Sequence, residues 1–135
     1  MRTEVSFSAE GFNTVESKEH FINEHNFGED LAEAISSRLA GQGCEVGEIG
    51  QEDHGWYFSF RGHTLLVGHV SEASGEWVAW VERDAGFISS LFGGRNRGIQ
   101  SEALLAVHET LRAMPEVRDV RWSARCADEA FETPV

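Results

Sequence analysis

The sequence predicts one α+β domain over residues 1–135, in which two helices cover one face of a mostly antiparallel sheet of five to six strands. A chain of 135 residues with 41% hydrophobic residues has the size and apolar content of one ordinary domain. Four segments alternate apolar and polar residues and two short ones are apolar on both sides, whereas two others repeat apolar residues at helical spacing. The expected order is therefore β-α-β-β-β-β-α-β, and the short connections between its middle strands favour antiparallel pairing.

The predicted core forms around the strand Trp56–Arg61, in which Trp56, Phe58 and Phe60 share one side. The segment Thr64–Ser71 is apolar on both sides, which is typical of a central strand. The other predicted strands are Glu4–Ala9, Cys44–Ile49, Glu76–Glu82 and Val117–Cys126. We expect the acidic tail from Ala127 onward to be loosely held.

The first helix is predicted from the apolar stripe of Leu31, Ile35 and Leu39. Asn26 is its expected N-cap, with Glu29 three residues later completing a capping box. The second helix is expected to start at Ser101 as its N-cap and to end before Pro115. Its apolar stripe consists of Leu104, Val107, Leu111 and Met114.

The charge of the chain argues against two classes of partner. A net charge of −12 repels nucleic acid and anionic lipid, so we expect neither as a partner. The only locally basic region is near the C-terminus, with six arginines in residues 95–125. Two cysteines without C-x-x-C spacing, and no apolar run of membrane length, favour a cytoplasmic protein with reduced, buried thiols. Ten arginines against one lysine suggest a bacterial source.

The stretch Gln51–Trp56 contains the most suggestive group of titratable residues. Glu52, Asp53 and His54 could be read as an acid–base group, but consecutive residues in a turn diverge. We favour a turn before a core strand, with Asp53 bonding backbone amides and Gly55 supplying an unusual dihedral. The six histidines lack metal-ligand spacing, so we expect no metal and no cofactor.

The segment Gly93–Gly98 resembles a phosphate cradle ahead of a helix. Arg95, Arg97 and the amide of Gly98 could hold an anion at the helix N-terminus. No Lys-Ser/Thr follows, so it is not a Walker loop, and a solvated connection is the simpler interpretation. The preceding apolar residues 86–92 fit one or two helical turns.

Four residues form the predicted binding surface: Tyr57, Arg61, Arg121 and Arg125. Each lies on the side of its strand opposite the tryptophan and phenylalanine positions. If the helices cover the aromatic side, these residues stand on the open face, where arginine and tyrosine favour a protein partner. The expected partner is an acidic protein surface or a second copy of the chain, and an ordinary solvated face is the alternative.

Two blocks of sequence, Phe21–Asn23 with Phe27–Ala32 and Gln51–Trp56, resemble a group of small uncharacterised bacterial proteins. The group has no established activity, so the resemblance implies no catalytic residue. Our leading hypothesis is a non-enzymatic protein-binding module of immunity-like, accessory or chaperone-like type. The alternative is a small enzyme or anion-binding domain that uses the Gly93–Gly98 loop.

Overall fold

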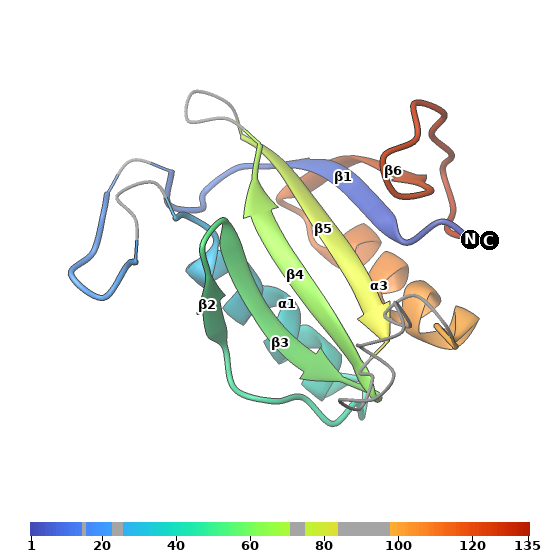
Figure 1. The fold of residues 1–135 in the computed structure, drawn as a ribbon, viewed down its shortest axis with the longest axis horizontal. Helices are drawn as coiled ribbons and strands as arrows, with labels where there is room; N and C mark the ends of the chain where they lie inside the picture. Colours follow the sequence, from blue (N-terminus) through green and yellow to red (C-terminus); the bar gives the residue numbers. More distant parts are fainter. Residues whose placement is uncertain (15, 23–25, 71–74, 84–97) are drawn as a thin grey trace.

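The computed structural model describes residues 1–14, 16–22, 26–70, 75–83 and 98–135. Within these residues the chain forms the predicted sequence of strands and helices, and the α+β fold class is confirmed (Figure 1). The strands are β1 (Glu4–Ala9), β2 (Gly50–Glu52), β3 (Gly55–Phe60), β4 (His63–His69), β5 (Glu76–Arg83) and β6 (Val117–Ser123). The helices are α1 (Glu29–Gly41) and α3 (Ser101–Ala113).

The six strands form one antiparallel sheet in the order β2-β3-β4-β5-β1-β6. The hairpins β3–β4 and β4–β5 are the expected meander, and β4 is a central strand, as predicted. The N-terminal strand β1 inserts between β5 and β6, so the two chain ends lie side by side (Figure 1). Both helices pack behind the sheet in that view, which leaves the other face toward the reader.

The core lies between the sheet and the helices. The inward residues of β3 and β5 are large, and Trp77, Phe58 and Phe60 are almost completely buried. The helical stripes meet them: Leu31, Ile35 and Leu39 of α1 and Leu104, Val107 and Leu111 of α3 are all fully buried. The apolar periodicities therefore identify the core correctly on both layers.

The predicted strand Cys44–Ile49 is wrong. Only Val46 in this segment forms a bridge, to Phe60, whereas the edge strand begins at Gly50. The alternation of Cys44–Ile49 was weak, and the hairpin turn at Asp53 and His54 determines which residues can pair with β3. Glu52 therefore lies at the end of a strand rather than in the turn itself.

Both predicted helix caps are also wrong. Gly28 is the N-cap of α1, at φ 126°, a conformation that favours glycine, and Asn26 lies outside the helix. The N-cap of α3 is Gln100, one residue before Ser101, and no side chain caps that helix. Instead Gln100 donates its backbone N–H to Nε2 of the buried His63, at 3.1 Å. Tertiary contacts thus replace the local capping that the sequence favours.

Gly55 does not supply an unusual dihedral, because its φ is not positive. It is required for close approach instead: a Cβ at this position would lie 2.4 Å from the carbonyl oxygen of Val67 in β4. Glycine is therefore needed at position 55, as expected, but because of the close approach of β4 and not because of its dihedral angle.

The C-terminal segment departs from expectation in two ways. Strand β6 ends at Ser123, and Cys126 is exposed rather than buried. The tail is not loose throughout, since Phe131 exchanges two 2.7 Å backbone hydrogen bonds with Trp122. Arg2 stacks on Phe131 with 3.4 Å between the guanidinium carbon and the ring centroid. These contacts hold the two chain ends together.

Candidate functional site

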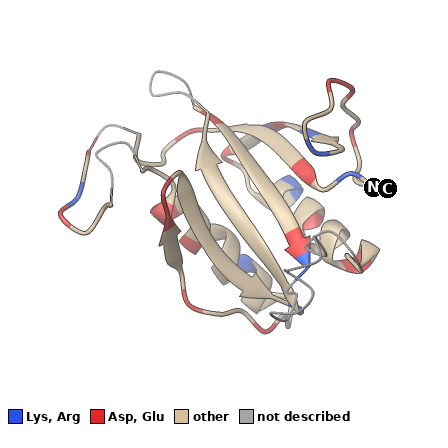
Figure 2. Ribbon diagram, viewed as in Figure 1, with Lys and Arg blue, Asp and Glu red and all other residues tan. Residues whose placement is uncertain are grey.

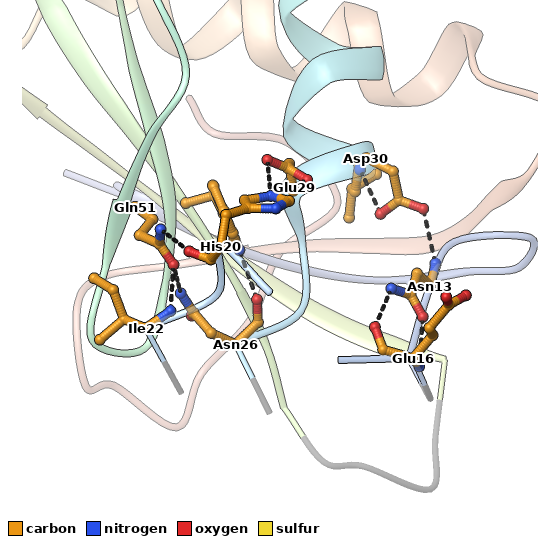
Figure 3. A network of polar contacts seen from close by, with 10 residues as sticks. Asn13, Glu16, His20, Ile22, Asn26, Glu29, Asp30 and Gln51 are labelled. Carbon is orange, nitrogen blue, oxygen red and sulfur yellow. Dashed lines mark hydrogen bonds and ion pairs between the residues drawn. The ribbon is translucent and has the colours of Figure 1, made fainter. Parts of the chain in front are cut away.

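The segment before α1 folds over the β2–β3 hairpin and forms a polar group that we call the corner network, consisting of His20, Asn26, Gln51 and Trp56. Figure 3 shows the first three of these residues. The Gln51 side chain donates to the carbonyl of His20 at 2.7 Å and accepts from the backbone N–H of Ile22 at 2.7 Å. The Asn26 amide nitrogen donates to Glu52 O at 3.0 Å and to Gln51 Oε1 at 3.3 Å. These bonds join two segments that are about 25 residues apart in sequence.

Trp56 carries the largest side chain of the corner network. It is 3% exposed, and its Nε1–H donates to the carbonyl of Asn26 at 2.6 Å. The rings of Phe21 and His20 meet it edge to face, with centroids 5.4 Å and 5.8 Å away. His20 Nε2 in turn lies 2.7 Å from a carboxylate oxygen of Glu29. Phe21 and Ile22 of one sequence block thus contact Trp56 and Gln51 of the other.

Glu52, Asp53 and His54 are exposed at the tip of the hairpin. Asp53 and His54 form the turn, which confirms that part of the prediction. Among the described residues no group of three or more His, Cys, Asp or Glu side chains is arranged to hold a metal ion.

The face of the sheet opposite the helices carries a line of large side chains that we call the open-face row: Tyr57, Leu66 and Trp80. The strand registers place them directly beside one another, Tyr57 opposite Leu66 and Leu66 opposite Trp80. Tyr57 is 37% exposed, and the other two are partly exposed. The row continues to Glu4 of β1, whose carboxylate accepts from Trp80 Nε1–H at 2.5 Å. The described helices lie on the other side and do not cover the row.

A hollow of about 340 Å³ opens beside this row. Its floor is Leu66 and Trp80, and the indole lies over Gly68, where a Cβ would come within 3.5 Å of the ring. The hairpin turn forms one wall, because the carbonyl of His54 would be 3.0 Å from the same Cβ. Gly68 therefore allows the turn and the indole to approach each other.

The charged walls of the hollow come from three parts of the chain. Its lining includes Glu52 and Asp53 of the turn, Glu82 of β5 and Arg125 after β6. Arg125 Nη1 lies 3.5 Å from Glu82 Oε1. Three carboxylates against one guanidinium give the described residues of this lining a net charge of −2 with His54 neutral. By contrast with this charged lining, strands β3 and β4 contain no Lys, Arg, Asp or Glu, and their ribbons are tan throughout in Figure 2.

The four predicted surface residues are not brought together as one patch. Tyr57 and Arg121 are both exposed on the open face, but β4, β5 and β1 lie between their strands. Four strand spacings separate them by about 19 Å. Arg125 lies beyond the end of β6, beside the acidic hollow. Arg61 is not in a strand at all: it sits in the β3–β4 turn at φ 49°, next to a second, shallower hollow.

The predicted anion loop falls largely outside the described residues. Arg95, Arg97 and the expected helical turns at residues 86–92 all lie in the range 84–97, which the structure does not describe. Gly98 is described and has φ 76°, as a glycine permits. Anion binding by this loop stays a prediction.

Sequence reasoning missed the central residue of the open face. In the predicted strand Glu76–Glu82, alternation puts Trp77 and Trp80 on opposite sides, but nothing in the sequence indicates which side faces the helices. The register resolves the choice, because Trp77 is fully buried and Trp80 is partly exposed. One feature of the sequence could have indicated an unusual open face. Val78 and Trp80 share one side of this strand, whereas a strand face exposed to water is normally polar.

His108 of α3 has a displaced pKa, and it lies on the helical side of the sheet. Burial lowers the pKa of His108 from its ordinary value, the Arg112 guanidinium lowers it further, and Glu109 acts in the opposite direction. Trp122 Nε1–H donates to His108 Nδ1 at 3.1 Å, so this nitrogen must be unprotonated. The histidine is thus a structural acceptor and is remote from the hollow.

Comparisons with known proteins give no relative: no protein-family model, no curated protein and no solved structure matches the chain. Within the described residues, no helix combines the length and apolar character needed to cross a membrane. The class that the fold and the site define is therefore an α+β domain with one sheet face left uncovered by its described helices.

Proposed function

We propose that this chain is a non-enzymatic module that binds another protein through the uncovered face of its sheet. The observation that carries the proposal is the open-face row, in which Tyr57, Leu66 and Trp80 stand beside one another across three strands. Aromatic residues that are partly exposed together favour a protein interface, because they bury much area at a small entropic cost. We further propose that the module acts in a bacterial cytoplasm, in an immunity-like or accessory role.

The contrast with the corner network supports this assignment. Gln51, the carbonyl of His20 and the amide nitrogen of Asn26 form hydrogen bonds within the protein, and the aromatic ring of Trp56 is buried beside them. Only the buried Oδ1 of Asn26 lacks a partner among the described residues. That region has a sufficient structural explanation. Within the described residues the open-face row has no comparable explanation, since a sheet face that is left to water is normally polar.

Site-specific photo-crosslinking tests the proposal in the cells from which the gene comes. A photoreactive phenylalanine analogue replaces Tyr57 on the open face, and in a control chain it replaces Glu33, which is exposed on α1. We expect a discrete adduct with one other protein from position 57 and none from position 33. The adduct should disappear when Trp80→Leu is added and persist when Arg38→Gln is added on the helical side.

Two results would contradict the proposal. If position 57 gives no adduct, or gives the same adducts as position 33, the open face has no specific partner. An adduct of twice the chain's own mass would show that the face joins two copies, and the heterologous partner would then be ruled out. The Trp80→Leu chain must retain its cooperative unfolding transition for either reading to count.

A further inference from the structure

The hollow beside Trp80 combines an aromatic floor with acidic walls, an arrangement suited to a cation. The indole of Trp80 is fixed in orientation by its 2.5 Å hydrogen bond to Glu4 and lies over Gly68. Its ring forms the floor together with Leu66. A cation over the face of a tryptophan is attracted by the negative face of the ring, most strongly when it is partly desolvated.

The charges around the floor have the sign that a cation requires. Glu52, Asp53 and Glu82 line the hollow, and Arg125 is the only basic residue among the described part of its lining. Glu4 adds a fourth carboxylate at the edge of the indole. A concave surface with one dominant sign of charge concentrates its field, and a chain of net charge −12 reinforces it.

Arg125 itself indicates which cation fits. Its guanidinium already faces this wall, with Nη1 3.5 Å from Glu82 Oε1, while its side chain stays 51% exposed. The contact is long and solvent-accessible, so it restrains Arg125 only weakly. A guanidinium brought by another molecule could share or replace this contact and reach the Trp80 ring as well.

We infer that the hollow binds an arginine or lysine side chain presented by the basic surface of a partner protein. This inference rests on the proposed function and gives the partner a chemical class. It reverses the sign expected from sequence, where Arg121 and Arg125 suggested an acidic partner. A second copy of this chain is a poor occupant, because two molecules of charge −12 repel each other.

Titration of the purified protein with matched short peptides tests the inference without the natural partner. The probes are acetyl-Leu-Arg-Leu-amide, its Gln analogue and its Glu analogue. The readout is the backbone N–H resonances of Leu66 and Gly68, which lie at the hollow and are present in every variant. We expect the Arg peptide to bind at least about threefold more tightly than the Gln peptide, as a cation–π contact at an accessible site implies. Raising the ionic strength should reduce this preference.

Charge-changing variants make the test specific. Glu82→Gln should weaken binding of the Arg peptide, and Arg125→Gln should strengthen it, because the first removes an attracting group and the second a competing one. Glu33→Gln on α1 is the matched control: it changes the net charge as Glu82→Gln does, but on the helical layer. It should leave the peptide affinity unchanged within about a factor of 1.5, since exposed charges at that distance are screened.

Ring variants separate the indole from the fold. Trp80→Phe keeps an aromatic face and should retain the preference for arginine, whereas Trp80→Leu should lose it. Equal affinity for the Arg and Gln peptides in the wild type would overturn the inference. So would weaker Arg-peptide binding in Arg125→Gln, or tighter binding of the Glu peptide than of the Arg peptide. These outcomes are independent of the crosslinking result, so failure of the inference and failure of the proposed function can be told apart.

Discussion

Trp56 and Tyr57 are consecutive in β3, and they belong to two regions that use similar residues in opposite ways. Trp56 points into the core side, is 3% exposed and donates a hydrogen bond to Asn26. Tyr57 points to the open face and is 37% exposed. The corner network around Trp56 makes its hydrogen bonds within the protein, with only the buried Oδ1 of Asn26 lacking a partner among the described residues. The open-face row around Tyr57 leaves apolar area to solvent. The comparison teaches that aromatic content alone identifies neither a core nor a binding surface, because strand alternation assigns each ring to a side.

The comparison predicts its largest effect on stability at Trp56. Replacing Trp56 by Ala removes a nearly fully buried indole and leaves the Asn26 carbonyl without its donor. We expect a loss of about 3–5 kcal/mol in the free energy of unfolding, measured by urea denaturation. A loss below about 1 kcal/mol would mean that the corner network does not support the core.

Gln51 is the next test, because its side chain joins both halves of the corner network. Replacement by Ala removes the hydrogen bonds to His20, Ile22 and Asn26. We expect the free energy of unfolding to fall by about 2 kcal/mol, because each hydrogen bond contributes about 1 kcal/mol and the bonds to His20 and Ile22 are exposed to solvent. Glu45→Ala, in the neighbouring loop, is a control expected to change stability by less than about 0.5 kcal/mol. Similar values for the two variants would contradict the structural role of Gln51.

Trp56 and Asn26 show how much of the corner network can be predicted from sequence. The periodicity around Trp56 predicts the core strand, because a two-residue repeat needs no knowledge of the partner strand. The role of Asn26 could not be predicted, since its bonds go to Gln51 and Glu52, which are brought near only by the fold. Local rules therefore suggested an N-cap, and a long-range contact replaced it.

The open face was predicted only in part for the same reason. Alternation places Tyr57 and Arg121 on the side away from the core, and both are exposed. Strand order cannot be read from alternation, and β1 enters between β5 and β6. That insertion separates Arg121 from Tyr57 and places the acid Glu4 beside Trp80. Tyr57 and Arg121 were therefore assigned to the correct side, but the strand order keeps them from forming one basic patch with Arg61 and Arg125.

A smaller effect on stability is expected at His108, and it depends on pH. Its folded-state pKa is lowered below the unfolded value, so the unfolded chain binds the proton more readily. Its contribution to stability is fully present above the unfolded pKa of about 6.5 and is lost as pH falls below that value. His108→Gln keeps an acceptor for Trp122 and should flatten the loss of stability between pH 7 and pH 5. An unchanged pH dependence, measured by thermal unfolding, would contradict this role.

The smallest effect is expected at Tyr57 itself. Tyr57→Ser removes an outward ring that packs over Gly50 at the edge of the sheet. We expect a loss of about 0.5–1 kcal/mol, the range of cross-strand contacts on an exposed face. Urea denaturation of Tyr57→Ser and Trp56→Ala under the same conditions compares the two losses in the free energy of unfolding directly. A cost at Tyr57 that approaches the cost at Trp56 would show that the open face serves folding rather than binding.

The central claim is that the corner network stabilises the fold while the open-face row binds a partner. The most direct measurement is the yield of the photo-crosslinked adduct from position 57 in two backgrounds, Gln51→Ala and Trp80→Leu, at a temperature where both chains are fully folded. We predict that the adduct persists in Gln51→Ala, although this chain is the less stable one, and is lost in Trp80→Leu. Loss of the adduct in Gln51→Ala with full retention in Trp80→Leu would contradict the account.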